Sequence, residues 1–328
     1  MSLHPWLQFD PEQVIRQISE SMREAVFSTL SRKGAVVAVS GGIDSSVCAA
    51  LSVNALGKEK IYGLLLPEKD SSSSSRTLGE ELCMHLGIAF ELMNIAPTLE
   101  AIGCYSWRDN AIRSVFPEYE SGWKNKIAIS KNLLESDRYN FFKLIVESPE
   151  GIRMEKRLPL NPYLQIVAAT SFKQRIRKTV EYFHADRLNY AVVGTPNRLE
   201  YDQGFFVKNG DGSADVKPIA HLYKSQVYEL GRYLGLPSKI CNTTPSTDTY
   251  SLAQGQDEFY FVLPYEKMDI ALFGFNAGRS AEEVGKEIGL SAEQAGRVFH
   301  DIKTKRKTTL PLHLKPLLLG PVPEIVQK

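Results

Sequence analysis

AVVAVSGGIDSS, residues 35–46, is the stretch that decides the fold. Its first half is a continuous apolar and β-branched run, which is typical of a strand buried on both faces of a parallel sheet. Its second half is a Gly-Gly turn followed by a helical stretch from about Asp44 to Ala55. Glycines at such a turn let the backbone approach a ligand closely, and the N–H groups at the helix start bind anions. We therefore predict a strand, an anion-binding loop and a helix.

The segments around this loop alternate between helix and strand patterns. An apolar stripe at helical spacing predicts a helix over residues 11–32, ahead of the first strand. Further strand patterns at 60–66, 89–95 and 189–195 alternate with helix patterns at 75–87 and 162–184, and another helix is expected at 223–234. Strands that alternate with helices form βαβ units, so we predict an α/β fold with a doubly wound parallel sheet.

We predict one domain over residues 1–328, because a single α/β domain with an insertion reaches this length. Residues 104–160 lack sustained periodicity and are interpreted as the insertion. Two roles stay open for it: reshaping a substrate pocket, or forming a decoration or a dimer surface. Residues 264–305 predict a helical carboxy-terminal lobe of three short helices, two of which start at capping-box patterns at Ser280 and Ser291.

Composition excludes several classes of protein. The chain has 39 Lys and Arg against 38 Asp and Glu, a net charge of +1, and 43% hydrophobic residues, as expected of a globular protein. This balance argues against a surface devoted to nucleic acid. No secretory signal and no stretch of ~20 apolar residues occurs, and the four cysteines form no CxxC pair. We expect a cytoplasmic protein with reduced thiols and neither nucleic-acid nor membrane partners.

The Ser-Gly-Gly loop predicts phosphate chemistry. The hydroxyls of Ser40, Ser45 and Ser46 add donors to the backbone N–H groups. Asp44 beside a phosphate would be repelled unless a divalent cation joined the two, so its presence suggests Mg²⁺. The loop matches neither the Walker pattern, since the Gly-Lys-Ser/Thr ending is missing, nor the GxGxxG dinucleotide fingerprint.

SGGIDSS after a buried strand resembles the pyrophosphatase loop of ATP-cleaving synthetases, which have a Rossmann-like fold of the adenine nucleotide alpha hydrolase type. A second block narrows the resemblance. GTPNRLE at 194–200 and GFFVKNGDGSAD at 204–215 are similar, almost position by position, to motifs of the ammonia-dependent NAD synthetases. PIAHLYK at 218–224 and PSTD at 245–248 are further matches, and the resemblance covers roughly residues 35–95 and 165–305.

This resemblance implies the amidation of deamido-NAD by ammonia, which gives NAD, AMP and pyrophosphate through an acyl-adenylate. ATP is then a substrate, Mg²⁺ the metal, and a homodimer the assembly, with the deamido-NAD site near the interface. The chain is too short to hold a glutaminase domain as well. Free ammonia is therefore the expected nitrogen source, and a separate glutaminase is a possible partner that supplies it.

The resemblance also assigns roles to individual residues. It implies Asp44, Glu200 and Lys224 as catalytic residues, with Asp44 and Glu200 holding the metal. A Lys ammonium is the expected partner of a polyphosphate. The implied ATP-binding residues are Ser40, Gly41, Gly42, Ile43, Asp44, Ser45, Ser46, Thr195, Lys224 and Ser246. The implied deamido-NAD-binding residues are Arg175, Lys208, Asp215, Thr304 and Lys305.

Several departures from the family pattern keep alternatives open. Thr304 stands where the family has His, Ser171 where it has Asn, and PEKD at 67–70 precedes a serine run where relatives often carry Arg. With the insertion, these motivate the alternative of an amide synthetase acting on a different carboxylate. A tRNA-modifying enzyme of the same loop superfamily and a non-catalytic nucleotide-binding module are more distant alternatives. The neutral charge balance and the missing CxxC pair count against the tRNA-modifying enzyme. The presence of Asp44 and Glu200 counts against the non-catalytic module.

Overall fold

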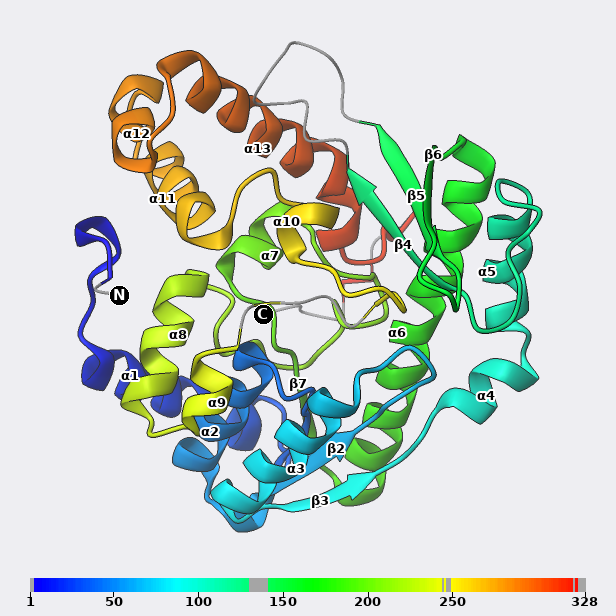
Figure 1. The fold of residues 1–328 in the computed structure, drawn as a ribbon. Helices are drawn as coiled ribbons and strands as arrows, with labels where there is room; N and C mark the ends of the chain where they lie inside the picture. The colour runs from blue at the N-terminus through cyan, green and yellow to red at the C-terminus, as the bar shows by residue number, and fades with distance from the viewer. Residues whose placement is uncertain (1–2, 130–140, 244, 246–248, 321, 324–328) are drawn as a thin grey trace.

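The fold is built on a four-stranded parallel sheet (Figure 1). The computed structural model describes residues 3–129, 141–243, 245, 249–320 and 322–323. The strands are β1 (Ala35–Ala38), β2 (Ile61–Leu65), β3 (Ala89–Leu92) and β7 (Ala191–Val193), in the order β3-β2-β1-β7. Ala35 of β1 lies opposite Ile61 on one side and Ala191 on the other. The predicted doubly wound α/β fold is confirmed.

Alternate residues of the central strands enter two different cores, as the period of a strand requires. Val37 packs in a core with α1 (Pro11–Arg23), α2 (Ile43–Leu56), α3 (Ser73–Leu86) and α8 (Lys224–Tyr233). Val36 packs on the opposite face with α4 (Ala96–Ala101), α5 (Cys104–Arg113) and the long α6 (Leu160–Leu188). Helices therefore cover both faces of the sheet, which explains why β1 is apolar throughout.

The strand order creates a switch point in the middle of the sheet. From β1 the chain moves outward to β2 and β3, and it later returns to add β7 on the other side of β1. In open α/β sheets, ligands bind beyond the carboxyl ends of the strands at such a point. The Ser-Gly-Gly loop follows β1, and Gly194-Thr195 follows β7, so both lie there.

The segment predicted as an aperiodic insertion contains regular structure. After α5, it forms an antiparallel sheet of β4 (Lys124–Ile129), β5 (Phe142–Glu147) and β6 (Arg153–Arg157), in that order. Ile127 and Leu144 bury one face of this sheet against Ile112 of α5 and Ile166 of α6. Its position beside α6 is visible in Figure 1.

The carboxy-terminal lobe is helical, as predicted. α7 (Arg198–Gln203) leads into it, and α9 (Ser238–Cys241) and α10 (Gln256–Phe259) are single turns. α11 (Tyr265–Asn276), α12 (Ala281–Ile288) and α13 (Ala292–His313) form a separate core. Both predicted capping boxes, at Ser280 and Ser291, are present. α13 continues eight residues beyond the predicted end at Lys305 and reaches His313.

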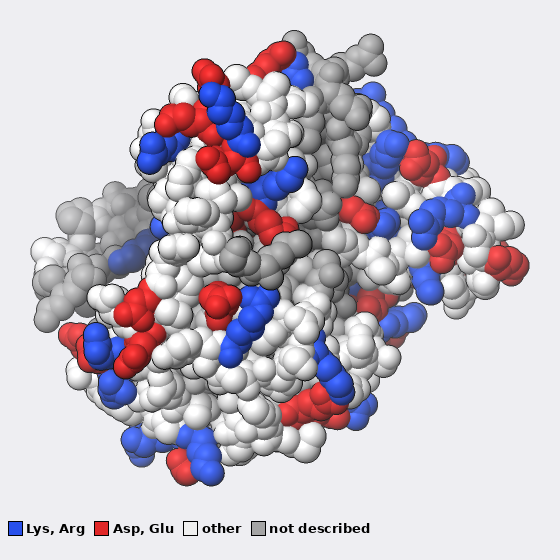
Figure 2. All heavy atoms as spheres, turned by 60° about the vertical axis from the view of Figure 1, so that its left-hand side comes forward, with Lys and Arg blue, Asp and Glu red and all other residues white. Residues whose placement is uncertain are grey.

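The remaining elements are short. α1 passes into a π-helical turn at Glu24–Thr29, so the predicted helix over 11–32 ends slightly early, and 3₁₀ turns occur at Pro5–Leu7 and Lys58–Lys60. Among the helices of the described residues, none combines the length and the apolar character needed to cross a membrane. On the face drawn in Figure 2, positive and negative side chains are interspersed, in agreement with the nearly balanced composition.

Candidate active site

The loop after β1 needs glycine for two reasons. Gly41 has φ of +78°, a region in which a side chain is strained. A Cβ on Gly41 would also lie 2.5 Å from the carbonyl oxygen of Ser75. Gly42 is the N-cap of α2, and its carbonyl accepts hydrogen bonds from the hydroxyls of Ser45 at 3.0 Å and Ser46 at 2.8 Å. These serines therefore shape the loop from behind.

Two carboxylates are linked through one asparagine. Asp44 lies in the first turn of α2, and its Oδ1 accepts a hydrogen bond from Nδ2 of Asn197 at 3.2 Å. Asn197 also forms the capping box of α7 with Glu200: the Glu200 N–H donates to its Oδ1 at 3.1 Å, and its own N–H donates to Glu200 Oε2 at 3.3 Å. Sequence reasoning missed Asn197, although Asn-x-x-Glu is a capping-box pattern.

Lys224 is buried beside these carboxylates. Its side chain is 2% exposed and forms an ion pair with Oδ2 of Asp44. Burial lowers the pKa of the Lys224 ammonium, but Asp44 and Glu200 outweigh this effect, so the pKa is raised above its ordinary value. The side chain is therefore a fixed positive charge at the site.

A second buried acid, which sequence reasoning also missed, anchors the start of α8. Asp269 of α11 is fully buried, and its Oδ2 accepts hydrogen bonds from both the N–H and the hydroxyl of Ser225 at 2.7 Å. Ser225 follows Lys224 directly, so Asp269 fixes the turn from which the lysine extends. Burial raises the pKa of Asp269 to about 7, although its hydrogen bonds from Ser225 and the nearby Lys224 lower it.

These groups surround a cavity of about 510 Å³ at the switch point. Of the predicted ATP-binding residues, it is lined by Ser40, Gly41, Gly42, Ile43, Asp44, Ser45, Thr195 and Lys224, together with the predicted metal ligand Glu200. Serines at the start of α3 and aromatic side chains such as Phe142, Tyr163 and Tyr260 form the other walls. A second cavity of about 290 Å³ shares Ser40 and Thr195 with it and extends over the carboxyl end of β2.

Asp44 and Glu200 fit a magnesium ion that also binds phosphate. Both carboxylates line the same cavity, and both contact Asn197. Among the described residues there is no cluster of three or more His, Cys, Asp or Glu side chains that could hold a metal. Mg²⁺ usually takes one or two carboxylates, with phosphate oxygens and waters as its other ligands. Two carboxylates in the wall of one cavity match that coordination.

The predicted deamido-NAD-binding residues line neither cavity among the described residues. Arg175 and Lys208 lie together, because Arg175 Nε donates to the Lys208 carbonyl at 3.3 Å, and Lys208 Nζ reaches the Pro311 carbonyl at 2.8 Å. Asp215 is exposed and accepts from the Val192 N–H at 2.7 Å.

Thr304 and Lys305, the other two predicted deamido-NAD-binding residues, lie on α13. Two predicted ATP-binding residues, Ser46 and Ser246, are not among the described lining residues of the larger cavity. Thr304 is exposed. Lys305 donates to the carbonyl of Tyr260, a residue of the larger cavity wall, at 2.7 Å. Ser46 is fully buried behind the Ser-Gly-Gly loop. Ser246 lies outside the described residues.

The sequence is similar to one family along most of its length. A family model described as NAD synthase matches residues 14–116 and 124–311. The chain is 50% identical over 316 residues to an "NH(3)-dependent NAD(+) synthetase" of Rhizobium rhizogenes, which covers 96% of this chain and 95% of that one. It is 55% identical over 301 residues to the protein of the same name from Rhizobium meliloti, over 92% and 90% of the two chains.

Solved structures with low sequence identity share the fold. The structure of NMN synthetase from Francisella tularensis superposes with a TM-score of 0.64 at 24% identity, over 96% of this chain and 99% of that one. The NH3-dependent NAD synthetase from Campylobacter jejuni superposes with a TM-score of 0.62 at 20% identity, over 95% and 100%. At these identities the likeness concerns the arrangement of helices and strands alone.

Proposed function

Because the chain belongs to the NAD synthase family, we propose that it amidates deamido-NAD with ammonia and cleaves ATP to AMP and pyrophosphate. The protein is a ligase that forms a carbon–nitrogen bond, and its reaction is a step of NAD biosynthesis. One structural observation carries the assignment to this site. The anion-binding loop, Asp44, Glu200 and Lys224 surround a single cavity at the switch point of the sheet.

The first step forms an acyl-adenylate. An oxygen of the substrate carboxylate attacks the α-phosphorus of ATP, and the bond to the bridging oxygen of the pyrophosphate breaks. We assign to the loop N–H groups and the Lys224 ammonium the stabilisation of negative charge on the phosphates and on the leaving pyrophosphate, which their position in the wall of one cavity supports. The Lys224 side chain is buried beside Asp44, so its ammonium is held at the wall of the cavity.

The second step replaces the adenylate with an amide. Ammonia attacks the acyl carbon, the bond to the AMP oxygen breaks, and the nitrogen loses a proton. No side-chain nucleophile is needed, since orientation of the two reactants supplies the rate. The four cysteines are free thiols and all are buried, so none of them presents an exposed thiol as a nucleophile.

Mg²⁺ is part of the proposal, with Asp44 and Glu200 as its protein ligands. When bound there, the ion neutralises charge on the phosphates. Asn197 donates one hydrogen bond to each carboxylate, from its side-chain amide to Asp44 and from its backbone N–H to Glu200. In this proposal Asp44 contacts both the Mg²⁺ ion and the Lys224 ammonium.

The deamido-NAD subsite is proposed over Arg175, Lys208, Asp215, Thr304 and Lys305. Lys305 supports it through its contact with the cavity wall at Tyr260. All five residues lie outside the cavities of one chain, and we propose a homodimer whose second copy completes the subsite. We propose that the enzyme works in the cytoplasm, since its four cysteines are free thiols.

The test is a reconstituted reaction of purified protein with ATP, MgCl₂, NH₄Cl and deamido-NAD, in which NAD and AMP are quantified by chromatography. We expect equal amounts of both products, and their loss in Asp44→Asn. ATP-dependent pyrophosphate release with another carboxylate, but none with deamido-NAD, would replace this proposal with the alternative amide synthetase.

A further inference from the structure

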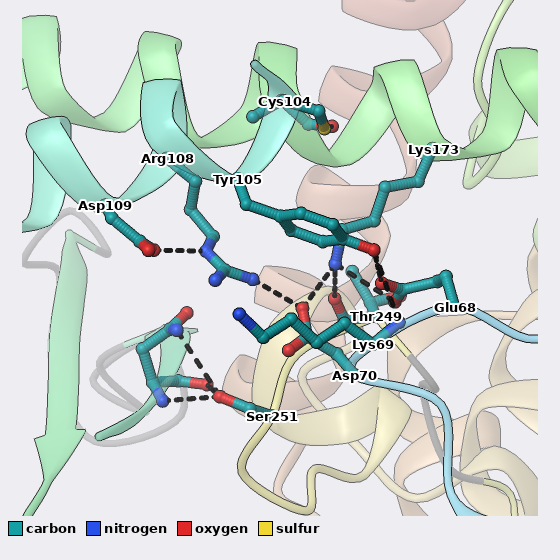
Figure 3. Close-up of polar contacts among 12 residues, drawn as sticks. Glu68, Lys69, Asp70, Cys104, Tyr105, Arg108, Asp109, Lys173, Thr249 and Ser251 are labelled. Carbon is teal, nitrogen blue, oxygen red and sulfur yellow. Dashed lines mark hydrogen bonds and ion pairs between the residues drawn. The ribbon is translucent and has the colours of Figure 1, made fainter. Parts of the chain in front are cut away.

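A buried ion-pair network joins α5, α6 and the loop between β2 and α3 (Figure 3). The Lys173 ammonium of α6 lies 3.1 Å from Oε1 of Glu68 and 2.5 Å from Oδ2 of Asp70. Arg108 of α5 approaches the same Asp70 oxygen at 2.5 Å and pairs with Asp109 at 2.8 Å. These residues come from a loop and two helices that are far apart in sequence.

The network is almost completely excluded from water. The side chains of Lys173, Glu68 and Asp70 are 3%, 0% and 6% exposed. Burial would raise the pKa of Asp70, but Lys173 and Arg108 lower it below its ordinary value, so the carboxylate is ionised. Buried ion pairs contribute little net stability, because desolvation offsets their attraction. Stability alone is therefore a weak reason for this network.

The positions of its members suggest a different role. Glu68 and Asp70 lie in the loop between β2 and α3. The larger cavity is lined by serines that follow them at the start of α3: the N-cap residue Ser72, and Ser74 and Ser75 in the first turn. The Lys173 ammonium also reaches the carbonyl of Thr249, at 3.5 Å, on a separate segment that lines both cavities. One ammonium group thus joins two walls of the phosphate site.

The antiparallel sheet fixes the second wall from its other side. The N–H of Asn125 on β4 donates to the hydroxyl of Ser251 at 2.8 Å, and the Leu252 N–H donates to the Asn125 carbonyl at 3.1 Å. On the network's side, Tyr105 of α5 donates its hydroxyl hydrogen to Glu68 at 2.8 Å. The segment predicted as an insertion therefore holds both walls.

We propose that Lys173 is a positioning residue for ATP binding. Its ammonium group holds residues 67–75, which include the cavity-lining serines, and residues 249–252 at the separation that ATP requires. The inference rests on the proposed function, since it takes the cavity to be the ATP site. Without the ammonium, the two walls are no longer joined, and the protein spends more time with the cavity widened. The apparent affinity for ATP then falls with the fraction of molecules in the competent state.

The first experiment compares Lys173→Met with the wild type. We expect the KM for ATP and the Kd for α,β-methylene ATP, measured by calorimetry, to rise at least about tenfold, with kcat at saturating ATP within about threefold. Val284→Ala, a core truncation in α12 away from both cavities, is the control for reduced stability. Unchanged ATP affinity in Lys173→Met, or equal changes in both variants, would overturn the inference.

A second variant keeps the test decisive if Lys173→Met does not fold. Glu68→Gln with Lys173→Met removes one charge of each sign, so the pair of Asp70 with Arg108 stays balanced. The same loss of ATP affinity is expected, and wild-type affinity in this variant would refute the role of Lys173.

Hydrogen exchange tests the inference without any turnover. In the wild type, α,β-methylene ATP should slow exchange in residues 67–75 and 249–252 together, and Lys173→Met should speed exchange in both. Protection of only one segment would contradict the proposed link. A wild-type protein that binds the analogue but makes no NAD would count against the proposed function, while leaving this test of Lys173 intact.

Discussion

Asp269→Asn should change how the stability of the protein depends on pH. Asp269 is fully buried beneath the start of α8, with both hydrogen bonds from Ser225 on one oxygen. Its Oδ1 has no hydrogen-bond partner among the described residues. Asn keeps an acceptor for Ser225 but cannot ionise, so it isolates the contribution of the charge.

The magnitude follows from the pKa of Asp269, which burial raises from 3.8 to about 7. Between these pH values the folded state keeps the proton and the unfolded state has lost it, so unfolding becomes easier as the pH rises. Each pH unit changes the free energy of unfolding by about 1.4 kcal/mol. From pH 5 to 7 the wild type should therefore lose about 2 kcal/mol relative to Asp269→Asn, because the slope weakens as the pH approaches the folded-state pKa.

The assay is urea unfolding of both proteins at pH 5, 6 and 7, from which the free energy of unfolding is extrapolated. Asp186→Asn, at an exposed position near the end of α6, is the control for removing a carboxylate. Parallel curves for the wild type and Asp269→Asn would refute the reasoning. A wild type that gains stability relative to the variant with rising pH would show that the Lys224 charge dominates over burial.

Three further predictions concern the phosphate loop and its charged partners. Gly41→Ala should lower the free energy of unfolding in urea by about 1–3 kcal/mol and raise the KM for ATP, since a Cβ would lie 2.5 Å from the Ser75 carbonyl oxygen. Gly235→Ala, at φ of +70° in open space, shows the backbone strain alone, and an equal effect of the two would disprove the clash. Lys224→Met should lower kcat/KM for ATP by about 10²–10³, whereas Lys239→Met, which removes an exposed pair with Glu81, should not. A smaller loss than tenfold in initial-rate measurements would exclude Lys224 from the phosphate site. Glu200→Gln keeps the capping-box side chain but should raise the Mg²⁺ concentration for half-maximal rate at least about tenfold. An unchanged Mg²⁺ titration, with exposed Glu229→Gln as the control, would remove Glu200 from the metal site.

The parallel sheet and the phosphate loop could be predicted because their signals are local. β1 is apolar at consecutive positions since both faces of the sheet are covered, and the glycines of the loop follow it directly. The antiparallel sheet has no such signal. β6, RMEKR, is largely exposed and carries four charged residues among its five, so no apolar pattern marks it. The single-domain organisation with an insertion stays a prediction.

The site was predictable where one motif places residues on one loop. Residues 40–45 and Glu200 could be proposed from their motifs, and they line the cavity together. Lys173 and Arg177 are four residues apart, a spacing that puts both on one helix face, and both contact the β2–α3 loop. Their partners could not be predicted, because Glu68 precedes Lys173 by 105 residues and only the fold joins them.

In the proposed reaction, the substrate carboxylate attacks the α-phosphorus of ATP at the Ser-Gly-Gly loop. Deamido-NAD labelled with ¹⁸O in its carboxylate tests this directly, with mass spectrometry of the products after the reaction with ATP and ammonia. An acyl-adenylate transfers one labelled oxygen to AMP and leaves the other in the amide of NAD. We predict one ¹⁸O in each AMP formed and none in pyrophosphate. Unlabelled AMP, or label in inorganic phosphate alongside ADP, would contradict the account.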